Sequence, residues 1–244
     1  MAKDYDFFET PGPPPRQSGE RLATGGTAGG EVDNLGDRSP LRTIWTRPRA
    51  TVRRIIARDP SLYVIPLVGL SGVGGMLGQA SAQGVGTELS TAEILAAAAI
   101  FGPLLSLLGL WAFSHLIRLS GGWIGGFAPR DHIRTAIAWS SVPAVASLPL
   151  WIPMILIAGH ELFLLDKPQL EGQPAMMNTV GALMLAQASL AIWGFVLLCR
   201  AVAEVQGFGS AWKGLGNVLL AAVLLVAISL VIATLLGPWL PAAA

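Results

Sequence analysis

Residues 60–87 read PSLYVIPLVGLSGVGGMLGQASAQGVGT, a run without a single Asp, Glu, Lys or Arg. Four further runs also lack charged residues. Each of the five runs is longer than the roughly 20 apolar residues that a helix needs to cross a hydrocarbon core of about 30 Å. The four further runs cover residues 94–117, 135–160, 172–199 and 214–244. A soluble helix would carry polar residues on its outer face at every turn. The sequence therefore predicts an all-α bundle of five transmembrane helices, over about 62–79, 93–117, 133–157, 178–199 and 216–236.

The polar residues of the chain are concentrated before the first of these runs. Only 13% of the 244 residues are charged, against about 25% in an ordinary soluble domain. Residues 1–40 are rich in Pro, Gly and charge, which predicts a disordered cytosolic tail. Its acidic and aromatic start, residues 4–9, is either a short docking motif or an unstructured terminus, and composition favours the second. No signal-peptide core is present in this tail, so we expect the first span to drive membrane insertion.

Residues 41–59 form a basic segment that joins the tail to the five-span domain of residues 60–244. Pro48 suits the first turn of a helix, and Val52, Ile55 and Ile56 then fall on one helical face. This pattern predicts an amphipathic helix lying at the bilayer surface. Nucleic acid would be a rival partner for its arginines, but the membrane span that follows makes anionic lipid the nearer one. The side chains expected to contact anionic headgroups are Arg49, Arg53, Arg54 and Arg58.

The distribution of Lys and Arg between the spans predicts the orientation of the chain. Eleven basic residues would lie on the side of the basic segment, and Lys167 alone would lie on the other side. Because positively charged loops stay in the cytoplasm, we expect the N-terminus inside and the C-terminus outside. The Ala-, Gly- and Arg-rich composition favours the inner membrane of a bacterium.

Glycine and proline mark the positions at which we expect helices to pack closely or to bend. Glycine allows close approach of membrane helices, and the first span carries Gly69, Gly72, Gly74, Gly75 and Gly78, of which Gly74 and Gly78 form a GxxxG. Proline removes a helical hydrogen bond and leaves carbonyls for neighbours to satisfy. The expected kink positions are Pro103 in the second span and Pro143, Pro149 and Pro153 in the third.

No catalytic residue, metal site or cofactor site is predicted. His160 and Glu161 begin like a zinc-protease HExxH, but Leu164 stands where the second ligand would be. His115 is the one ionisable side chain within a span and is by default a functional candidate. It lies within one turn of Arg118, however, which favours a structural role near the interface.

Three stretches resemble the family of bacterial Yip1-domain proteins. The first is IWTRPRAT at residues 44–51, followed by an Arg-rich helix and a span. The second is Gly121-Gly122 with IAWSSVP at residues 137–143, in which Trp139 occupies a position where the family usually has tyrosine. The third is the loop before the last span, with Glu204, Gly207, Ser210, Trp212 and Lys213. Together they cover the chain from residue 41 onward.

The resemblance implies a five-span membrane protein that interacts with other proteins. Eukaryotic relatives associate with small GTPases and with one another, and those GTPase partners do not transfer to a bacterial-looking chain. We therefore expect a non-enzymatic scaffold or assembly subunit whose partner is another membrane protein or a second copy, with anionic lipids around it and no nucleic acid. A permease, channel or lipid-handling protein is the alternative, and an intramembrane enzyme built around His115 is a more distant one.

Overall fold

The computed structural model describes residues 39–167 and 172–236. The predicted tail up to residue 38, with its acidic and aromatic start, lies outside the described residues. Within them, the chain is helical and contains five segments long and apolar enough to cross a membrane, so the all-α, five-span prediction is confirmed. These segments are Val64–Gln83, Thr91–Trp123, Arg130–Phe163, Pro174–Val205 and Ala211–Leu235.

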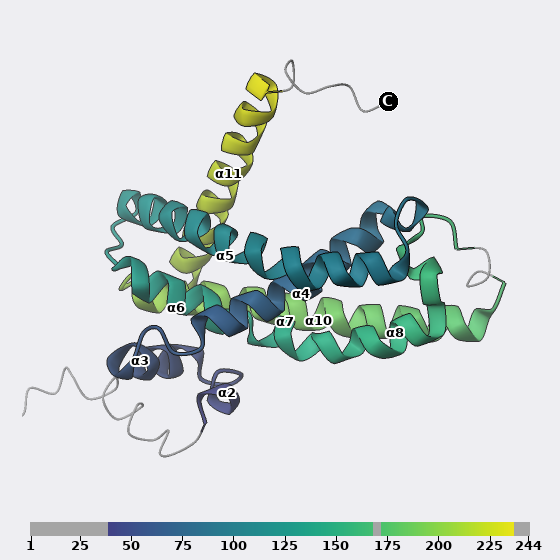
Figure 1. The fold of residues 1–244 in the computed structure, drawn as a ribbon. Coiled ribbons are helices and arrows are strands. Elements are labelled where there is room, and N and C mark those ends of the chain that lie inside the picture. The colour runs from purple at the N-terminus through teal and green to yellow at the C-terminus, as the bar shows by residue number, and fades with distance from the viewer. Residues whose placement is uncertain (1–38, 168–171, 237–244) are drawn as a thin grey trace, which may run out of the picture.

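Four of the five segments lie side by side along one direction (Figure 1). They are α4 (Val64–Gln83), α5 (Thr91–Trp123), the interrupted third segment and α10 (Pro174–Val205). The short α2 (Pro40–Thr43) and α3 (Pro48–Arg58) pack at one end of this bundle, which we call the arginine end. The fifth segment, α11 (Ala211–Leu236), begins at the same end, crosses α10 and α5, and then leaves the bundle.

Several helix ends lie beyond the predicted spans, and identifiable caps set the boundaries between α4 and α5. Ser90 and Glu93 form a reciprocal capping box that starts α5, in which the Ser90 N–H donates to Glu93 Oε2 at 2.8 Å. Gly84 ends α4 with a φ of +67°, a conformation that glycine adopts without strain. The short η1 (Val85–Thr87) links the two helices.

The third segment is broken where its prolines predict. It consists of α6 (Arg130–Ser140), α7 (Val142–Ser147), η2 (Leu148–Leu150), α8 (Trp151–Ala158) and η3 (Gly159–Phe163). Pro143 lies in the first turn of α7, Pro149 lies in η2, and Pro153 lies near the start of α8. Pro103 differs, because α5 continues through it as one helix. A kink at Pro103 therefore stays a prediction.

Among the glycines of α4, the tightest approach to α5 is at Gly72, outside the predicted GxxxG pair. A Cβ added at Gly72 would lie 2.3 Å from the Gly102 carbonyl oxygen and 2.4 Å from Ser106 Oγ. At Gly75, by contrast, a Cβ would meet nothing within 4 Å. Gly72 and Gly102 therefore face each other directly, and the sequence alone did not identify Gly102.

The glycines on the other face of α4 line a shallow groove instead. At Gly74 an added Cβ would come within 3.1 Å of Leu148, and at Gly78 within 3.9 Å of Trp151. One wall of a hollow of about 330 Å³ is formed by Ser71, Gly74, Gly75 and Gly78, and its other walls are α7, α8 and α10. Gly69 is loosely apposed to Pro103 at 3.5 Å.

Candidate functional site

The α3 helix is fixed on the bundle by its apolar face. Val52 and Ile55 are completely buried in a cluster with Ile44, Trp139 and Leu197. Ile56 packs against the same cluster. The apolar stripe, which we predicted would face the bilayer, therefore packs on α6 and α10 instead. The sequence identified the stripe correctly but could not tell a lipid surface from a protein surface, because both are apolar.

The link between α3 and α4 is held by side chains of α6. Trp139 donates its indole N–H to the Leu62 carbonyl at 3.1 Å. Thr135 Oγ1 donates to the carbonyl of Pro60. Where α3 ends, the Ser61 hydroxyl and backbone N–H donate to the Asp59 carboxylate and lower the pKa of that group.

One carboxylate, Glu204 near the end of α10, joins α3 to the loop before α11. Arg53 Nε donates to Glu204 Oε1 at 2.8 Å, and a second nitrogen of the same guanidinium contacts that oxygen. Arg49 Nε lies 4.0 Å from Glu204 Oε2, and Arg49 Nη2 donates to the Phe208 carbonyl at 3.4 Å. Two arginines predicted to contact lipid headgroups are therefore engaged by the protein.

The loop at residues 206–210 has a defined structure that depends on Gly207. Gly207 has a φ of +74°, in the left-handed region. The Phe208 N–H donates to the Ala203 carbonyl at 2.8 Å, and the Gly207 N–H donates to the Glu204 carbonyl at 3.1 Å. This pair of bonds is a Schellman motif, which ends a helix and reverses the chain. It holds the Phe208 carbonyl where Arg49 of α3 donates to it.

The start of α11 carries the remaining residues of the predicted loop motif. Ser210 accepts a hydrogen bond from the Trp212 N–H at 3.2 Å, as an N-cap does. Trp212 and Lys213 are exposed, Trp212 to 79%. Gly214, which we did not single out, lies so close to α10 that an added Cβ would be 2.2 Å from the Cys199 carbonyl oxygen.

A buried polar cluster joins α5 to the loop and to α11, and sequence reasoning assigned no site there. The side-chain amides of Gln206 and Asn217 each donate to the Ile117 carbonyl at 3.1 Å. Both residues are almost completely buried. The Gln206 amide packs against Gly121, where an added Cβ would lie 2.1 Å from it. The Asn217 amide therefore links α11 to α5 by an interhelical hydrogen bond. Gly121 was singled out only as part of the family resemblance, and the sequence did not predict its close approach to Gln206.

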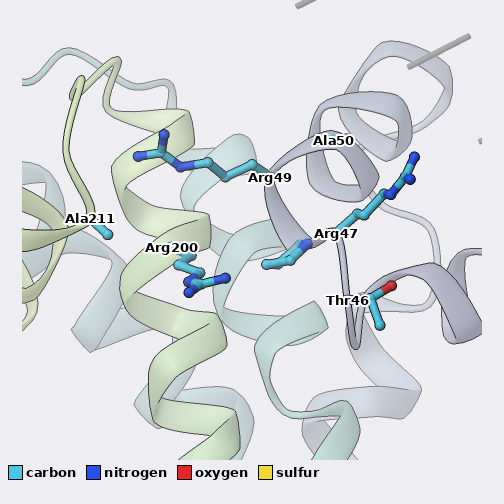
Figure 2. Close-up of a pocket in the computed structure, with 7 residues that line it drawn as sticks. Thr46, Arg47, Arg49, Ala50, Arg200 and Ala211 are labelled. Atoms are coloured by element: carbon cyan, nitrogen blue, oxygen red, sulfur yellow. The ribbon is translucent and has the colours of Figure 1, made fainter. Parts of the chain in front are cut away.

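A cavity of about 300 Å³ opens between the start of α3 and the start of α11 (Figure 2). Residues 46–50, Arg200 and Ala211 line it. Arg49 reaches from α3 toward α10, Arg200 extends from α10 toward α3, and the Arg47 side chain points away from both. Among the described residues, the Arg200 side chain has no hydrogen-bond or ion-pair partner.

The other predicted site residues lie apart from this arrangement. Arg58 is exposed at the end of α3 and Arg54 is partly buried. His115 is hydrogen-bonded to the Trp111 carbonyl of its own helix at 2.7 Å and packs against the Trp111 ring. His160 contacts Thr91 at 3.0 Å and the Gly86 carbonyl at 2.8 Å, at the opposite end of the bundle. Within residues 39–167 and 172–236, no three His, Cys, Asp or Glu side chains gather as metal ligands do.

The arginine end brings Arg49 and Arg53 of α3 and Arg200 of α10 close to one carboxylate, Glu204. No curated protein matches the chain, and no solved structure matches it either. The model of the family described as Yip1 domain matches residues 42–234. The match begins within α2 and ends in the last turn of α11. It includes α3, all five spans and the segment with Glu204 and Gly207. The chain belongs to the Yip1 domain family of membrane proteins, which is not a known enzyme family.

Proposed function

We propose that this protein is a non-enzymatic scaffold of the membrane, which binds another membrane protein or a second copy of itself through α11. The observation that carries the proposal is the exposure of the second half of this helix. Every residue from 225 to 235 is exposed, on all faces of about three helical turns. Only the first half of α11 packs on α5 and α10 (Figure 1).

The rest of the architecture supports a binding role. The Schellman turn at Gly207 and the Gln206–Asn217 cluster fix the first half of α11, so that the helix leaves the bundle in a defined direction. A membrane helix gains no hydrophobic energy from moving from lipid onto protein, so its partner must offer close packing or hydrogen bonds. We further propose that the arginine end faces the cytoplasm of a bacterium, because basic residues collect there.

A site-specific crosslink tests the scaffold proposal. A photoreactive benzoylphenylalanine is introduced for Ile232 in the exposed half of α11, and at Ile100 in α5 as the control. The two side chains are 50% and 59% exposed, so lipid access is matched. We expect a discrete protein adduct of one mass from Ile232 and none from Ile100. Adducts with lipid alone at both positions would contradict the proposal.

Passage of a small solute or a lipid is a second candidate, favoured by the groove between α4, the broken third segment and α10. Gln187 borders this groove, and its Nε2 is buried without a hydrogen-bond partner among the described residues. Broken helices line the sites of many transporters. In a liposome flux assay this candidate predicts transport that Gln187→Leu reduces. Equal flux with and without the protein would exclude it for the solutes tested.

A further inference from the structure

Two hollows of different character meet at the point where α10 and α11 cross. The first is the cavity of about 300 Å³ beside Arg49 and Arg200. The second is a groove of about 350 Å³ between α10 and α11, and it shares Arg200 and Ala211 with the cavity. Apart from these two residues, the groove is lined by Phe195, Val196, Cys199, Trp212 and Leu215. A basic cavity therefore continues into an apolar groove.

The cavity carries an excess of positive charge. The Arg49 side chain reaches from α3 toward α10, and the Arg200 side chain extends from α10 toward α3 (Figure 2). Glu204 lies against Arg49 at 4.0 Å, but it is engaged more closely by Arg53 at 2.8 Å. Arg200 has no carboxylate partner among the residues described. Guanidinium groups bind phosphate oxygens through directed, charge-assisted hydrogen bonds, so the complementary ligand is a phosphate group.

The groove lies beside the polar ends of α10 and α11, where their uncharged runs end and begin. Arg200 follows directly on the uncharged run of residues 172–199, so it marks the end of the apolar part of α10. Trp212, exposed to 79%, lies at the start of α11 on the same level. Tryptophan collects at the membrane–water interface in membrane proteins. Phe195, more than one turn before Arg200, lines the groove on the apolar side.

We propose that this composite hollow binds one anionic phospholipid. Its phosphate lies between Arg49 and Arg200, and one acyl chain follows the groove past Phe195 and Trp212. Basic pockets between membrane helices are known to hold anionic headgroups. The proposal differs from general attraction of the arginine helix to a charged surface, because it specifies one lipid at one site. It does not depend on the scaffold proposal, since it involves the first turns of α11 and not the exposed half.

Native mass spectrometry of the full chain in detergent tests the proposal, with phosphatidylglycerol and phosphatidylcholine as probes. We expect one phosphatidylglycerol to remain bound under conditions that remove phosphatidylcholine. Arg200→Gln should weaken phosphatidylglycerol binding about tenfold, the loss expected for one charge-assisted contact. Arg200→Lys should restore part of it. Arg58→Gln is the matched control, because Arg58 carries the same charge at the same end, outside the cavity, and should change binding less than twofold.

Several results would overturn the proposal. Equal retention of the two lipids by the unaltered protein would remove headgroup selectivity, and this comparison needs no variant. Equal weakening by Arg200→Gln and Arg58→Gln would indicate general surface attraction. Inorganic phosphate that displaces phosphatidylglycerol at equal concentration would show a phosphate site without an acyl-chain subsite. Displacement of the lipid by a peptide of residues 1–38 would assign the cavity to the acidic tail of the chain.

Discussion

Replacement of Gly72 by alanine should loosen the contact between α4 and α5. The added methyl group would lie 2.3 Å from the Gly102 carbonyl oxygen and 2.4 Å from Ser106 Oγ, where carbon and oxygen ordinarily approach to about 3.3–3.6 Å. The helices must separate by about 1 Å at this point. Backbone atoms on the opposite helix cannot rotate away, so the strain is not relieved by a side-chain movement alone.

Overpacking of this kind costs about 1–3 kcal/mol. For a chain of this length each kcal/mol corresponds to about 2–4 °C in the unfolding midpoint, so we expect a decrease of about 2–12 °C. The assay is thermal unfolding of the detergent-purified protein at a fixed heating rate, followed by tryptophan fluorescence, with the midpoint treated as an apparent value.

Gly75→Ala is the matched control, because it is the same substitution one turn away in the same helix and meets nothing within 4 Å. It should leave the midpoint unchanged or raise it slightly, since alanine favours the helix by up to about 1 kcal/mol. An unchanged midpoint for Gly72→Ala, or an equal decrease for both variants, would refute the proposed packing of α4 on α5.

Three further predictions concern the arginine end. Glu204→Gln should speed amide hydrogen exchange in α3 by roughly 5- to 30-fold, because it removes an ion pair whose contribution to stability is about 1–2 kcal/mol. The side chains of this pair are partly exposed, Glu204 to 17% and Arg53 to 37%. Glu88→Gln, which removes an exposed charge at the other end of the bundle, should leave exchange in α3 unchanged. Gly207→Ala should lower the free energy of unfolding by about 1–2 kcal/mol, because alanine is strained at a φ of +74°. Gly209→Ala should leave stability unchanged. Equal unfolding midpoints for the two variants would argue against the Schellman turn. Asn217→Leu should cost about 0.6–1.7 kcal/mol through loss of its bond to the Ile117 carbonyl, and an unchanged unfolding midpoint would remove that role.

Features that depend on local chain chemistry were predictable from the sequence. Runs without charge identified the five spans, because a charge in a hydrocarbon core is costly wherever the neighbouring helices lie. The prolines of the third span predicted its interruption, because proline removes a backbone donor in any context. The family motifs were sufficient to predict membership in the Yip1 domain family, which the match over residues 42–234 confirmed.

Features that depend on the arrangement of helices were not predictable. The glycines of α4 all look alike in sequence, and only the position of Gly102 distinguishes Gly72 from Gly75. The face of α3 packs on protein because Trp139 and Leu197 lie beneath it. Arg200 stands 147 positions beyond Arg53 in the numbering, and no periodicity of the sequence relates it to the start of α3. Its place in a cavity with Arg49 follows from the packing of α3 on α10 around Leu197 and Ala201.

The most direct test of the scaffold proposal is the mass of the protein extracted from its native membrane in polymer nanodiscs, without detergent. The chain itself has a mass of 25.5 kDa. The proposal predicts protein particles of one larger, fixed mass, which correspond to a second copy or to one partner in constant ratio. Particles that contain a single chain with lipid alone would contradict it and would favour the passage of a solute or a lipid.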